Sequence, residues 1–432
     1  MAKRQRPTKN GGEQRISTSV DDLLIAALAR GDDSLETGRY IITYKEDARD
    51  ESTKSLKAQG LRVADARDFT DQAVSLADAG DADALVFPEI GAAVIGGGAF
   101  RAHGLSVQDE ISDDSPIETI EPEYFAFAEA DQDLYLRGFR RAAQAIAEDL
   151  RSGDEAESEE LEAAVLGATW GLVACKVPPS TRSGLGIRVA VLDTGMDLQH
   201  PDFVGRVAAS RSFVGEPVQD LHSHGTHCIG TACGPQAPAG TTPRYGVAYR
   251  SRIYAGKVLS NSGSGSTASI LAGINWAIAN RCAVISMSLG ANTPVQAAYT
   301  AAGASALGKG LLIVAATGNA NMATGAPANS PTIMAVASLD NTLRRSSFSN
   351  FGKVEIAGPG RDVFSSVPRP TRYGIKTGTS MATPHVAGCA ALWAHTSSAL
   401  RGMALWKKLQ ATARALPEPA SRVGKGLVQA PA

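Results

Sequence analysis

The sequence has no long hydrophobic run and few aromatic residues. Only 6% of its 432 residues are aromatic, and no apolar stretch approaches the length of about 20 residues that a membrane-spanning helix needs. The first 15 residues are rich in lysine and arginine, but no apolar segment follows them as it would in a secretory signal. We therefore expect no membrane partner and a cytoplasmic location. The alternative is secretion by a route without a recognisable signal.

An excess of charge of either sign is also lacking. The formal net charge is −2, from 42 lysines and arginines against 44 aspartates and glutamates. A nucleic-acid-binding surface needs a strong positive field, so we expect no nucleic-acid partner. The length allows one large domain together with smaller units.

Cysteine is scarce, and its spacing matches no metal-binding pattern. An odd number of cysteines cannot all pair, and unpaired thiols fit a reducing compartment. The five cysteines are Cys175, Cys228, Cys233, Cys282 and Cys389.

A serine motif occupies residues 378–388, GTSMATPHVAG, ahead of the apolar residues 389–393. We expect Ser380 to open a buried helix, where its backbone N–H has no helical partner and the helix dipole favours negative charge. Pro384 fits the first turn of such a helix, because a missing N–H costs nothing there. The alternative is a capped core helix without a catalytic role.

A serine hydroxyl needs a general base, and the base needs an acceptor that orients it. Residues 187–192, IRVAVL, predict a buried parallel strand that delivers Asp193 to the edge of the sheet where ligands bind. Residues 222–230, HSHGTHCIG, predict a helix of small residues, with Ser223 as its N-cap and His224 as the base. Zinc binding is the alternative, but a zinc protease motif spaces its histidines by four and carries a glutamate between them.

The oxyanion of the tetrahedral intermediate needs hydrogen-bond donors. Residues 311–316, LLIVAA, predict another buried strand, which ends in TGN at residues 317–319. The side-chain amide of Asn319 and the backbone N–H of Ser380 are the candidate donors.

Together these motifs resemble the subtilisin-like serine proteases, nearest to the proteinase K branch. They follow the family's order Asp, His, Asn, Ser, and the likeness runs from about residue 170 to residue 413. The resemblance implies a doubly wound, mostly parallel α/β sheet with helices on both faces. It also implies a serine endopeptidase that cuts peptide or protein substrates through an acyl-enzyme. The implied catalytic residues are Asp193, His224, Ser380 and, in the oxyanion hole, Asn319.

Three further features concern the resemblance to the proteinase K branch. Cys228 stands where proteinase K-like enzymes carry a free thiol under the histidine, and residues 345–350, RSSFSN, also resemble that branch. Cys282 resembles a position that is disulfide-bonded in proteinase K. Arg188 stands where its partner is expected, so we expect no bridge.

The resemblance implies a cleft in which an extended peptide becomes the middle strand of three. The Gly/Ser loop at residues 260–266 would lie on one side, although it alone reads as a linker, and residues 288–290 on the other. The pocket for the residue before the cut is uncharged, which favours a medium or large apolar side chain. The expected substrate-binding residues are Ser262, Gly263, Ser264, Gly265, Ser288, Leu289, Gly290, Ala316, Thr317 and Gly318.

The chemistry requires no cofactor, but calcium is common in the family. Glu355 lies where an acidic ligand is usual, and the carbonyl oxygens of Pro331 and Ile333 would complete a site of hard oxygen ligands. With one carboxylate, this structural calcium site would be weak.

The N-terminal third predicts a separate small domain. Strands are expected at residues 38–45, 61–69, 84–95 and 117–127, and a helix at 48–59. This pattern is similar to the subtilisin propeptide, an α+β ferredoxin-like domain that assists folding and then inhibits, although its second helix is hard to find between residues 96 and 116. The tail at residues 121–127 can add itself to the substrate cleft as a strand. The alternative is an unrelated docking module.

We therefore expect four regions and a zymogen with an autoinhibitory prodomain. Residues 1–37 form a basic arm with a short helix at 20–30, and residues 38–128 the propeptide-like domain. Residues 129–166 form an amphipathic helix and acidic linker, and residues 167–432 the catalytic domain. The physiological role is general proteolysis or dedicated processing of a peptide precursor, and a silent peptide-binding regulator is the rival from another class.

Overall fold

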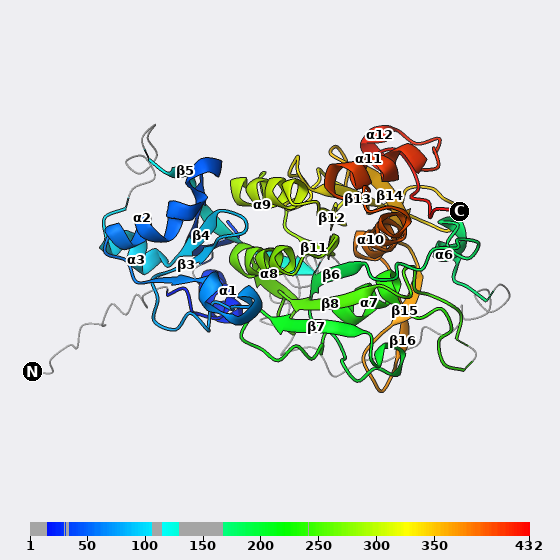
Figure 1. The fold of residues 1–432 in the computed structure, drawn as a ribbon, viewed down its shortest axis with the longest axis horizontal. Helices are drawn as coiled ribbons and strands as arrows, with labels where there is room; N and C mark the ends of the chain where they lie inside the picture. The colour runs from blue at the N-terminus through cyan, green and yellow to red at the C-terminus, as the bar shows by residue number, and fades with distance from the viewer. Residues whose placement is uncertain (1–14, 30, 32–33, 106–114, 129–166, 241) are drawn as a thin grey trace, which may run out of the picture.

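The computed structural model describes residues 15–29, 31, 34–105, 115–128, 167–240 and 242–432 (Figure 1). The larger part, from residue 167 onward, is built around a seven-stranded sheet with the order β14-β13-β12-β10-β6-β8-β7. Every pairing in this sheet is parallel. Its strands are β6 (Arg188–Asp193), β7 (Val207–Ser212), β8 (Arg252–Lys257), β10 (Val284–Met287), β12 (Leu312–Ala316), β13 (Met334–Leu339) and β14 (Ile356–Pro359).

Helices cover both faces of this sheet (Figure 1). Successive residues of a strand point to opposite faces. Val189 and Val191 of β6 accordingly pack with α7 (His224–Cys233) and α10 (Thr379–Thr396), and Ala190 and Leu192 pack with α8 (Thr267–Ala279) and α9 (Ala297–Gly308). The predicted doubly wound α/β fold is confirmed. In the described part of the chain, no helix has the length and apolarity needed to span a membrane.

Shorter elements surround the sheet. They are α6 (Trp170–Ala174), η5 (Pro201–Phe203), β9 (Ser264–Ser266), β11 (Leu289–Gly290), β15 (Val363–Ser366), β16 (Tyr373–Lys376), α11 (Gly402–Thr412) and α12 (Ala420–Val423). Of these, β9 and β11 matter most for function, because both pair with a strand from the N-terminal third of the chain.

The N-terminal domain is a second sheet with the strand order β5-β1-β4-β3-β2, antiparallel except between β2 and β3. One face of it packs on α8 and α9, where Leu85 and Phe87 share an apolar cluster with Ile270 and Ile274 (Figure 1). Its elements are β1 (Glu36–Tyr44), η1 (Glu46–Glu51), α2 (Ser52–Ala58), β2 (Val63–Asp65), η2 (Ala66–Asp68), η3 (Thr70–Gln72), β3 (Ala84–Phe87), β4 (Ala92–Ile95), α3 (Gly97–Ala102) and β5 (Ile117–Ala128).

The structure differs from the sequence prediction in three elements of this domain. The helix expected at 48–59 begins as a 3-10 turn, η1, and the strand expected at 61–69 ends early and turns into η2. The second helix is α3, which has Gly96 as its N-cap and begins with Gly97 and Gly98. Glycine disfavours helix, which explains why the pattern gave no helical signal there.

The region expected to be a basic arm is packed against the rest of the protein from residue 16 onward. Ile16 is fully buried, and α1 (Val20–Ala29) buries one face against β5, while β1 already begins at Glu36. Net charge suggested a solvated arm, but the apolar residues of α1 recur at helical spacing. The basic residues 1–14 and the expected helix and linker at 129–166 lie outside the described residues.

Candidate active site

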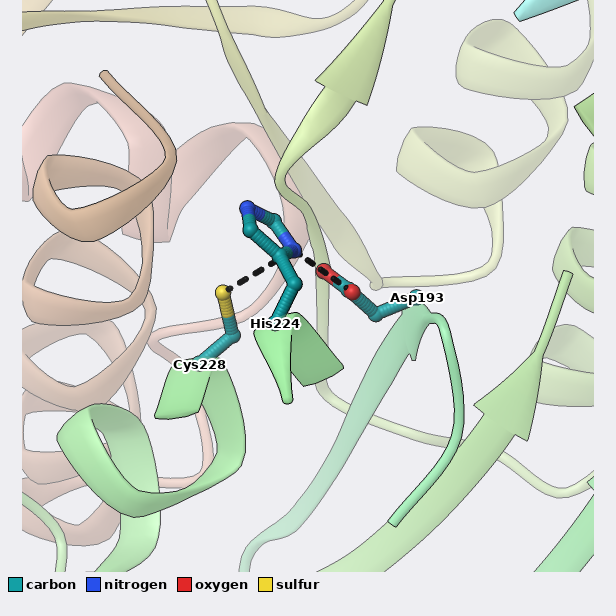
Figure 2. Close-up of side chains that lie close together, drawn as sticks. All are labelled: Asp193, His224 and Cys228. Carbon is teal, nitrogen blue, oxygen red and sulfur yellow. Dashed lines mark hydrogen bonds and ion pairs between the residues drawn. The ribbon is translucent and has the colours of Figure 1, made fainter. Parts of the chain in front are cut away.

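Asp193 and His224 meet at the point of the sheet where the strand order reverses. Asp193 ends β6, which lies between β8 and β10, and His224 begins α7. The Nδ1 atom of His224 lies 2.7 Å from the Oδ1 atom of Asp193, and both side chains are buried (Figure 2). Open α/β sheets place their ligand sites at such a switch point. The carboxylate can therefore fix the orientation of the imidazole.

Asp220, which the sequence analysis missed, caps the histidine helix. Ser223 was expected to do so, but it adopts a left-handed backbone with φ 77° and its side chain makes no capping hydrogen bond. The Oδ2 atom of Asp220 accepts hydrogen bonds from the N–H and hydroxyl of Thr226, at 2.9 and 2.7 Å. Its Oδ1 atom accepts the hydroxyl of Thr194 at 3.0 Å. An acidic residue shortly before a helix start was the available signal.

Ser380 lies in the first turn of α10, which begins at Thr379. Its hydroxyl donates a hydrogen bond to the Ser288 carbonyl at 3.2 Å. The Nε2 atom of His224 is buried and makes no hydrogen bond within the described residues. The Cys228 thiol lies 3.9 Å from the Nδ1 atom of His224 and 3.6 Å from the Ser380 carbonyl, so one side chain contacts both residues. The Ser380 hydroxyl and His224 are not hydrogen-bonded here, and such bonds often form only when substrate binds.

Pro384 lies inside α10 rather than in its first turn, which corrects the sequence prediction. Its missing N–H therefore does remove a helical hydrogen bond, the one that the Ser380 carbonyl would accept. Two other donors reach this carbonyl: the Ser288 hydroxyl at 2.7 Å and the Cys228 thiol at 3.6 Å.

Asn319 follows β12 and adjoins the start of α10. Its Oδ1 atom accepts hydrogen bonds from the backbone N–H of Thr379 at 2.9 Å and from the Thr379 hydroxyl at 3.0 Å. These two bonds fix the amide plane, so Nδ2 lies on the opposite side. A Cβ atom at Gly378 would lie 3.3 Å from that nitrogen, which places the amide beside the backbone that leads into Ser380.

The second histidine of the motif, His227, does not face the site. Its Nε2 atom donates to the Val363 carbonyl at 2.9 Å, and burial lowers the pKa of His227 to about 3. It cannot join His224 at a zinc ion, as the alternative reading of the motif required. Among the described residues, the ligand atoms that converge within 4.8 Å belong to Asp193, His224 and Cys228, and hydrogen bonds already join them (Figure 2).

The residues expected to bind the substrate backbone hold β5. Ala126 pairs with Gly265 of β9, and Ala128 pairs with Leu289 of β11, both antiparallel. The N–H of Ala128 also donates to the Gly263 carbonyl at 2.9 Å. The middle strand of this three-stranded ribbon is therefore a segment of the chain itself. Ser264 and Gly290 both pair with Phe127, while the Ser262 hydroxyl contacts α1.

One segment was expected to line the pocket for the substrate residue that precedes the cleaved bond. This segment joins β12 to Asn319. Ala316 and Thr317 are buried, and the N–H of Gly318 donates to the Thr379 hydroxyl at 3.3 Å. The structure thus brings these three residues to the start of α10, next to Ser380.

The expected calcium ligands face a lysine instead. The Lys353 ammonium lies 2.7 Å from the Glu355 carboxylate and donates to the Ile333 carbonyl. The same carboxylate accepts the N–H of Ala335 at 2.6 Å. Burial lowers the pKa of Lys353, although the charge of Glu355 opposes that change. The residues present do not fit calcium at the site predicted from Pro331, Ile333 and Glu355, because the Lys353 ammonium already pairs with the Glu355 carboxylate and the Ile333 carbonyl.

Comparison with known proteins gives one consistent answer. The family model described as "Subtilase family" matches residues 184–426, more than half of the chain. The chain is similar to the alkaline protease of Alkalihalobacillus alcalophilus, with 39% identity over 64% of this chain and 72% of that protein. It is also similar to subtilisin Savinase of Lederbergia lenta, with 40% identity over 61% of this chain and 97% of that protein. A crystal structure of a cold adapted subtilisin-like serine proteinase covers 62% of this chain and 99% of its own, with a TM-score of 0.55 and 31% identity.

These relatives overturn the expected cytoplasmic location. The subtilisins that the chain matches are secreted, extracellular enzymes, so that prediction is wrong. Part of it depended on the unpaired cysteines. All five thiols are free and buried, so solvent does not reach them and they say little about the redox state of the compartment.

The first prediction concerns the pH dependence of peptide cleavage. Burial disfavours the imidazolium form of His224, but the charge and hydrogen bond of Asp193 together with the contact of Cys228 outweigh it and raise the pKa of His224 well above its ordinary value. Only the neutral imidazole accepts a proton, so kcat/KM should fall as the pH falls through this raised pKa and be greatest at alkaline pH.

Asp193→Asn tests the cause of the raised pKa and should lower kcat by about 10⁴-fold. In a Ser380→Ala background, NMR titration should show a lower His224 pKa after Asp193→Asn. An unchanged pKa would contradict the assignment.

The second prediction concerns the Lys353 ammonium. Lys353→Ala removes the ammonium partner of the Ile333 carbonyl and of the Glu355 carboxylate, and it should cost about 1–3 kcal/mol of unfolding free energy. Calcium should restore part of that loss, because a cation can then enter the oxygen site. Thermal unfolding of Ser380→Ala proteins with calcium or chelator measures both effects, and exposed Lys407→Ala is the matched control. If calcium raises the melting temperature of Lys353→Ala no more than that of the control, the ammonium does not fill a cation position.

Proposed function

Because the chain belongs to the subtilase family and is a serine endopeptidase, we propose that Asp193, His224 and Ser380 form its catalytic triad. We propose further that it is made as a zymogen whose N-terminal domain inhibits it. The observation that carries the second proposal is β5, which fills the gap between β9 and β11 and ends beside the candidate nucleophile.

The mechanism follows from the roles of these side chains. His224 takes the proton of the Ser380 hydroxyl as that oxygen attacks a peptide carbonyl, and Asp193 stabilises the imidazolium that forms. The Asn319 amide and the N–H of Ser380 hold the oxyanion. His224 then protonates the leaving amine, and water releases the acyl-enzyme. The 2.7 Å contact between His224 and Asp193 and the position of Ser380 in the first turn of a helix support these roles.

The likeness to the proteinase K branch has one structural support. The Cys228 thiol lies 3.9 Å from the Nδ1 atom of His224 and packs under the ring (Figure 2). This is where enzymes of that branch are expected to carry a free cysteine, and we infer on this ground that the chain lies nearest to them.

Two carboxylates fix the inhibitory strand to the catalytic domain. Glu121 of β5 accepts hydrogen bonds from the N–H groups of Ala297 and Ala298 at the start of α9, at 3.0 and 2.9 Å. Glu123 accepts the N–H of Ala268 at the start of α8, at 3.0 Å. Negative charge is favourable at both helix ends. These contacts support a domain that docks on α8 and α9 and directs β5 into the cleft.

The segment that precedes the propeptide-like domain covers the other side of β5. Phe125 and Phe127 are each 1% exposed and pack on Leu23 and Leu24 of α1. The Asp21 carboxylate accepts hydrogen bonds from Ser262 and Ser264, at 2.9 and 2.6 Å, next to the strand that holds β5. We therefore extend the proposed inhibitory region from residues 38–128 to include residues 16–29.

A buried ion pair joins α1 to this arrangement. Arg39 and Glu123 are both fully buried, and their Nε and Oε2 atoms lie 2.5 Å apart. Arg39 also donates to the Ile16 carbonyl at 2.8 Å and to the Ser266 hydroxyl at 3.3 Å. One guanidinium thus connects the chain before α1, the inhibitory strand and the edge of the cleft.

The proposed activating cut lies after β5, between Ala128 and the catalytic domain at residue 167.

General proteolysis is the role that we propose, with processing of a dedicated precursor as the second candidate. Antiparallel backbone pairing with β9 and β11 reads any extended peptide without regard to its side chains. The pocket expected from Ala316, Thr317 and Gly318 carries no charge. Both features favour many substrates over a single one.

The third prediction tests the nucleophile and the zymogen together. Intact mass spectrometry should show that the wild-type chain loses about its first third at neutral pH, while Ser380→Ala stays whole. Equal loss from both chains would rule out Ser380 as the nucleophile of self-processing. A wild-type chain that stays whole while cleaving peptides would mean that the N-terminal domain does not inhibit.

The fourth prediction tests the role of α1. Leu23→Asp puts a charge against Phe125 and Phe127, so it should loosen β5 and shorten the lag before peptide cleavage begins. Asp21→Asn should act in the same direction, because it weakens the contact with Ser262 and Ser264. The matched control is Ile25→Asp, since Ile25 is on the outer face of the same helix and 54% exposed. A lag that is the same in all three variants would show that α1 does not restrain the strand.

A further inference from the structure

We propose that Ser288 is a positioning residue for the nucleophile, and that Pro384 makes it necessary. The proposal rests on the proposed role of Ser380. Ser288 was expected only to line the substrate backbone. Its hydroxyl donates a hydrogen bond to the Ser380 carbonyl at 2.7 Å.

The need for this contact arises from helix geometry. In an α-helix, the carbonyl of one residue accepts the N–H of the residue four positions later. Four positions after Ser380 is Pro384, which has no N–H. Ser380 is fully buried, so water does not replace the missing donor. A buried carbonyl without a donor is costly, and the helix needs one from elsewhere.

Ser288 is the stronger of the two donors that reach this carbonyl. The Cys228 thiol lies 3.6 Å away, and a thiol is a weak donor. The Ser288 hydroxyl lies 2.7 Å away and is fully buried. The carbonyl that Pro384 leaves open is therefore satisfied mainly by the residue between β10 and β11.

Ser288 and Ser380 also exchange a second hydrogen bond. The Ser380 hydroxyl donates to the Ser288 carbonyl at 3.2 Å, so two bonds run in opposite directions between the same two residues. One bond fixes the backbone of the nucleophile. The other holds its hydroxyl in the state seen here and must break before His224 takes the proton. Since β11 follows Ser288 directly and pairs with the strand in the cleft, this pair sets the position of the nucleophile relative to the bound peptide.

The expected result of Ser288→Ala is a loss in kcat with little change in KM. The variant keeps the backbone of β11, so peptide pairing is unchanged, but the Ser380 carbonyl keeps only the weak thiol donor. Loss of one such hydrogen bond corresponds to about a tenfold fall in kcat. Ser288→Cys, which retains a weak donor of similar size, should give an intermediate value.

A double-mutant cycle with Pro384→Ala is the decisive experiment. Alanine at position 384 restores the helical N–H to the Ser380 carbonyl, so the Ser288 hydroxyl is no longer needed there. In that background, Ser288→Ala should lower kcat by about twofold or less, in place of about tenfold in the wild-type background. Titration of active sites with an irreversible serine reagent gives the concentration of folded enzyme, so that kcat is counted per competent site.

Ser286→Ala is the matched control. Ser286 lies two residues earlier on β10, and its buried hydroxyl makes no hydrogen bond within the described residues, so kcat should not change. An equal fractional loss from Ser288→Ala in both backgrounds would overturn the proposal, as would a loss expressed in KM. If Ser288→Ala does not fold, Ser288→Cys is carried through the same cycle. Failure of the triad itself would appear separately, as activity retained by Ser380→Ala.

Discussion

The way in which the N-terminal domain joins the rest of the protein depends on two strand edges that need hydrogen-bond partners. β9 and β11 face one another on either side of β5, and the backbone groups of each pair with it. A segment that enters that gap must be extended and must offer its own N–H and carbonyl groups, so an extended substrate would pair there in the same way as β5 does. The N-terminal domain satisfies this requirement with its last strand and then adds contacts that a substrate lacks, at the starts of α8 and α9.

Each proposed catalytic residue lies at the end of a helix or strand, where backbone groups lack partners within that element. A residue distant in the sequence supplies a hydrogen bond at or beside each of these ends. Asp220 caps α7 and joins it to the turn after Asp193. Asn319 accepts two hydrogen bonds from the first residue of α10. Ser288 supplies the donor that Pro384 cannot. Short buried hydrogen bonds of this kind have few alternative geometries, so the site is positioned before substrate arrives.

Features that depend on the local residue pattern, such as the central strands, could be predicted from the sequence. Features that depend on contacts with other parts of the chain could not. Apolar runs placed the central strands to within a few residues, and Asp193 at the end of β6 lies 2.7 Å from His224 at the start of α7. The first turn of α10 was set one or two residues too late, and that small error hid the consequence of Pro384. Glu355 was expected to bind calcium because the family usually has an acidic ligand at that place, and its pairing with Lys353, two residues away, was not foreseen. The N-terminal segment was judged by its charge, and its apolar face was overlooked.

Side chains along β5 alternate between two sides of the strand, one facing the catalytic domain and the other facing α1. Ala126 and Ala128 point toward the catalytic domain and share its apolar cluster, while Phe125 and Phe127 point the other way and are covered by α1. Residues of opposite parity in a strand necessarily face opposite sides. The small residues therefore occupy the positions that any substrate must fill. The large ones add burial against α1 that a separate substrate peptide does not have, and in the proposed activation this burial would be lost together with residues 16–29.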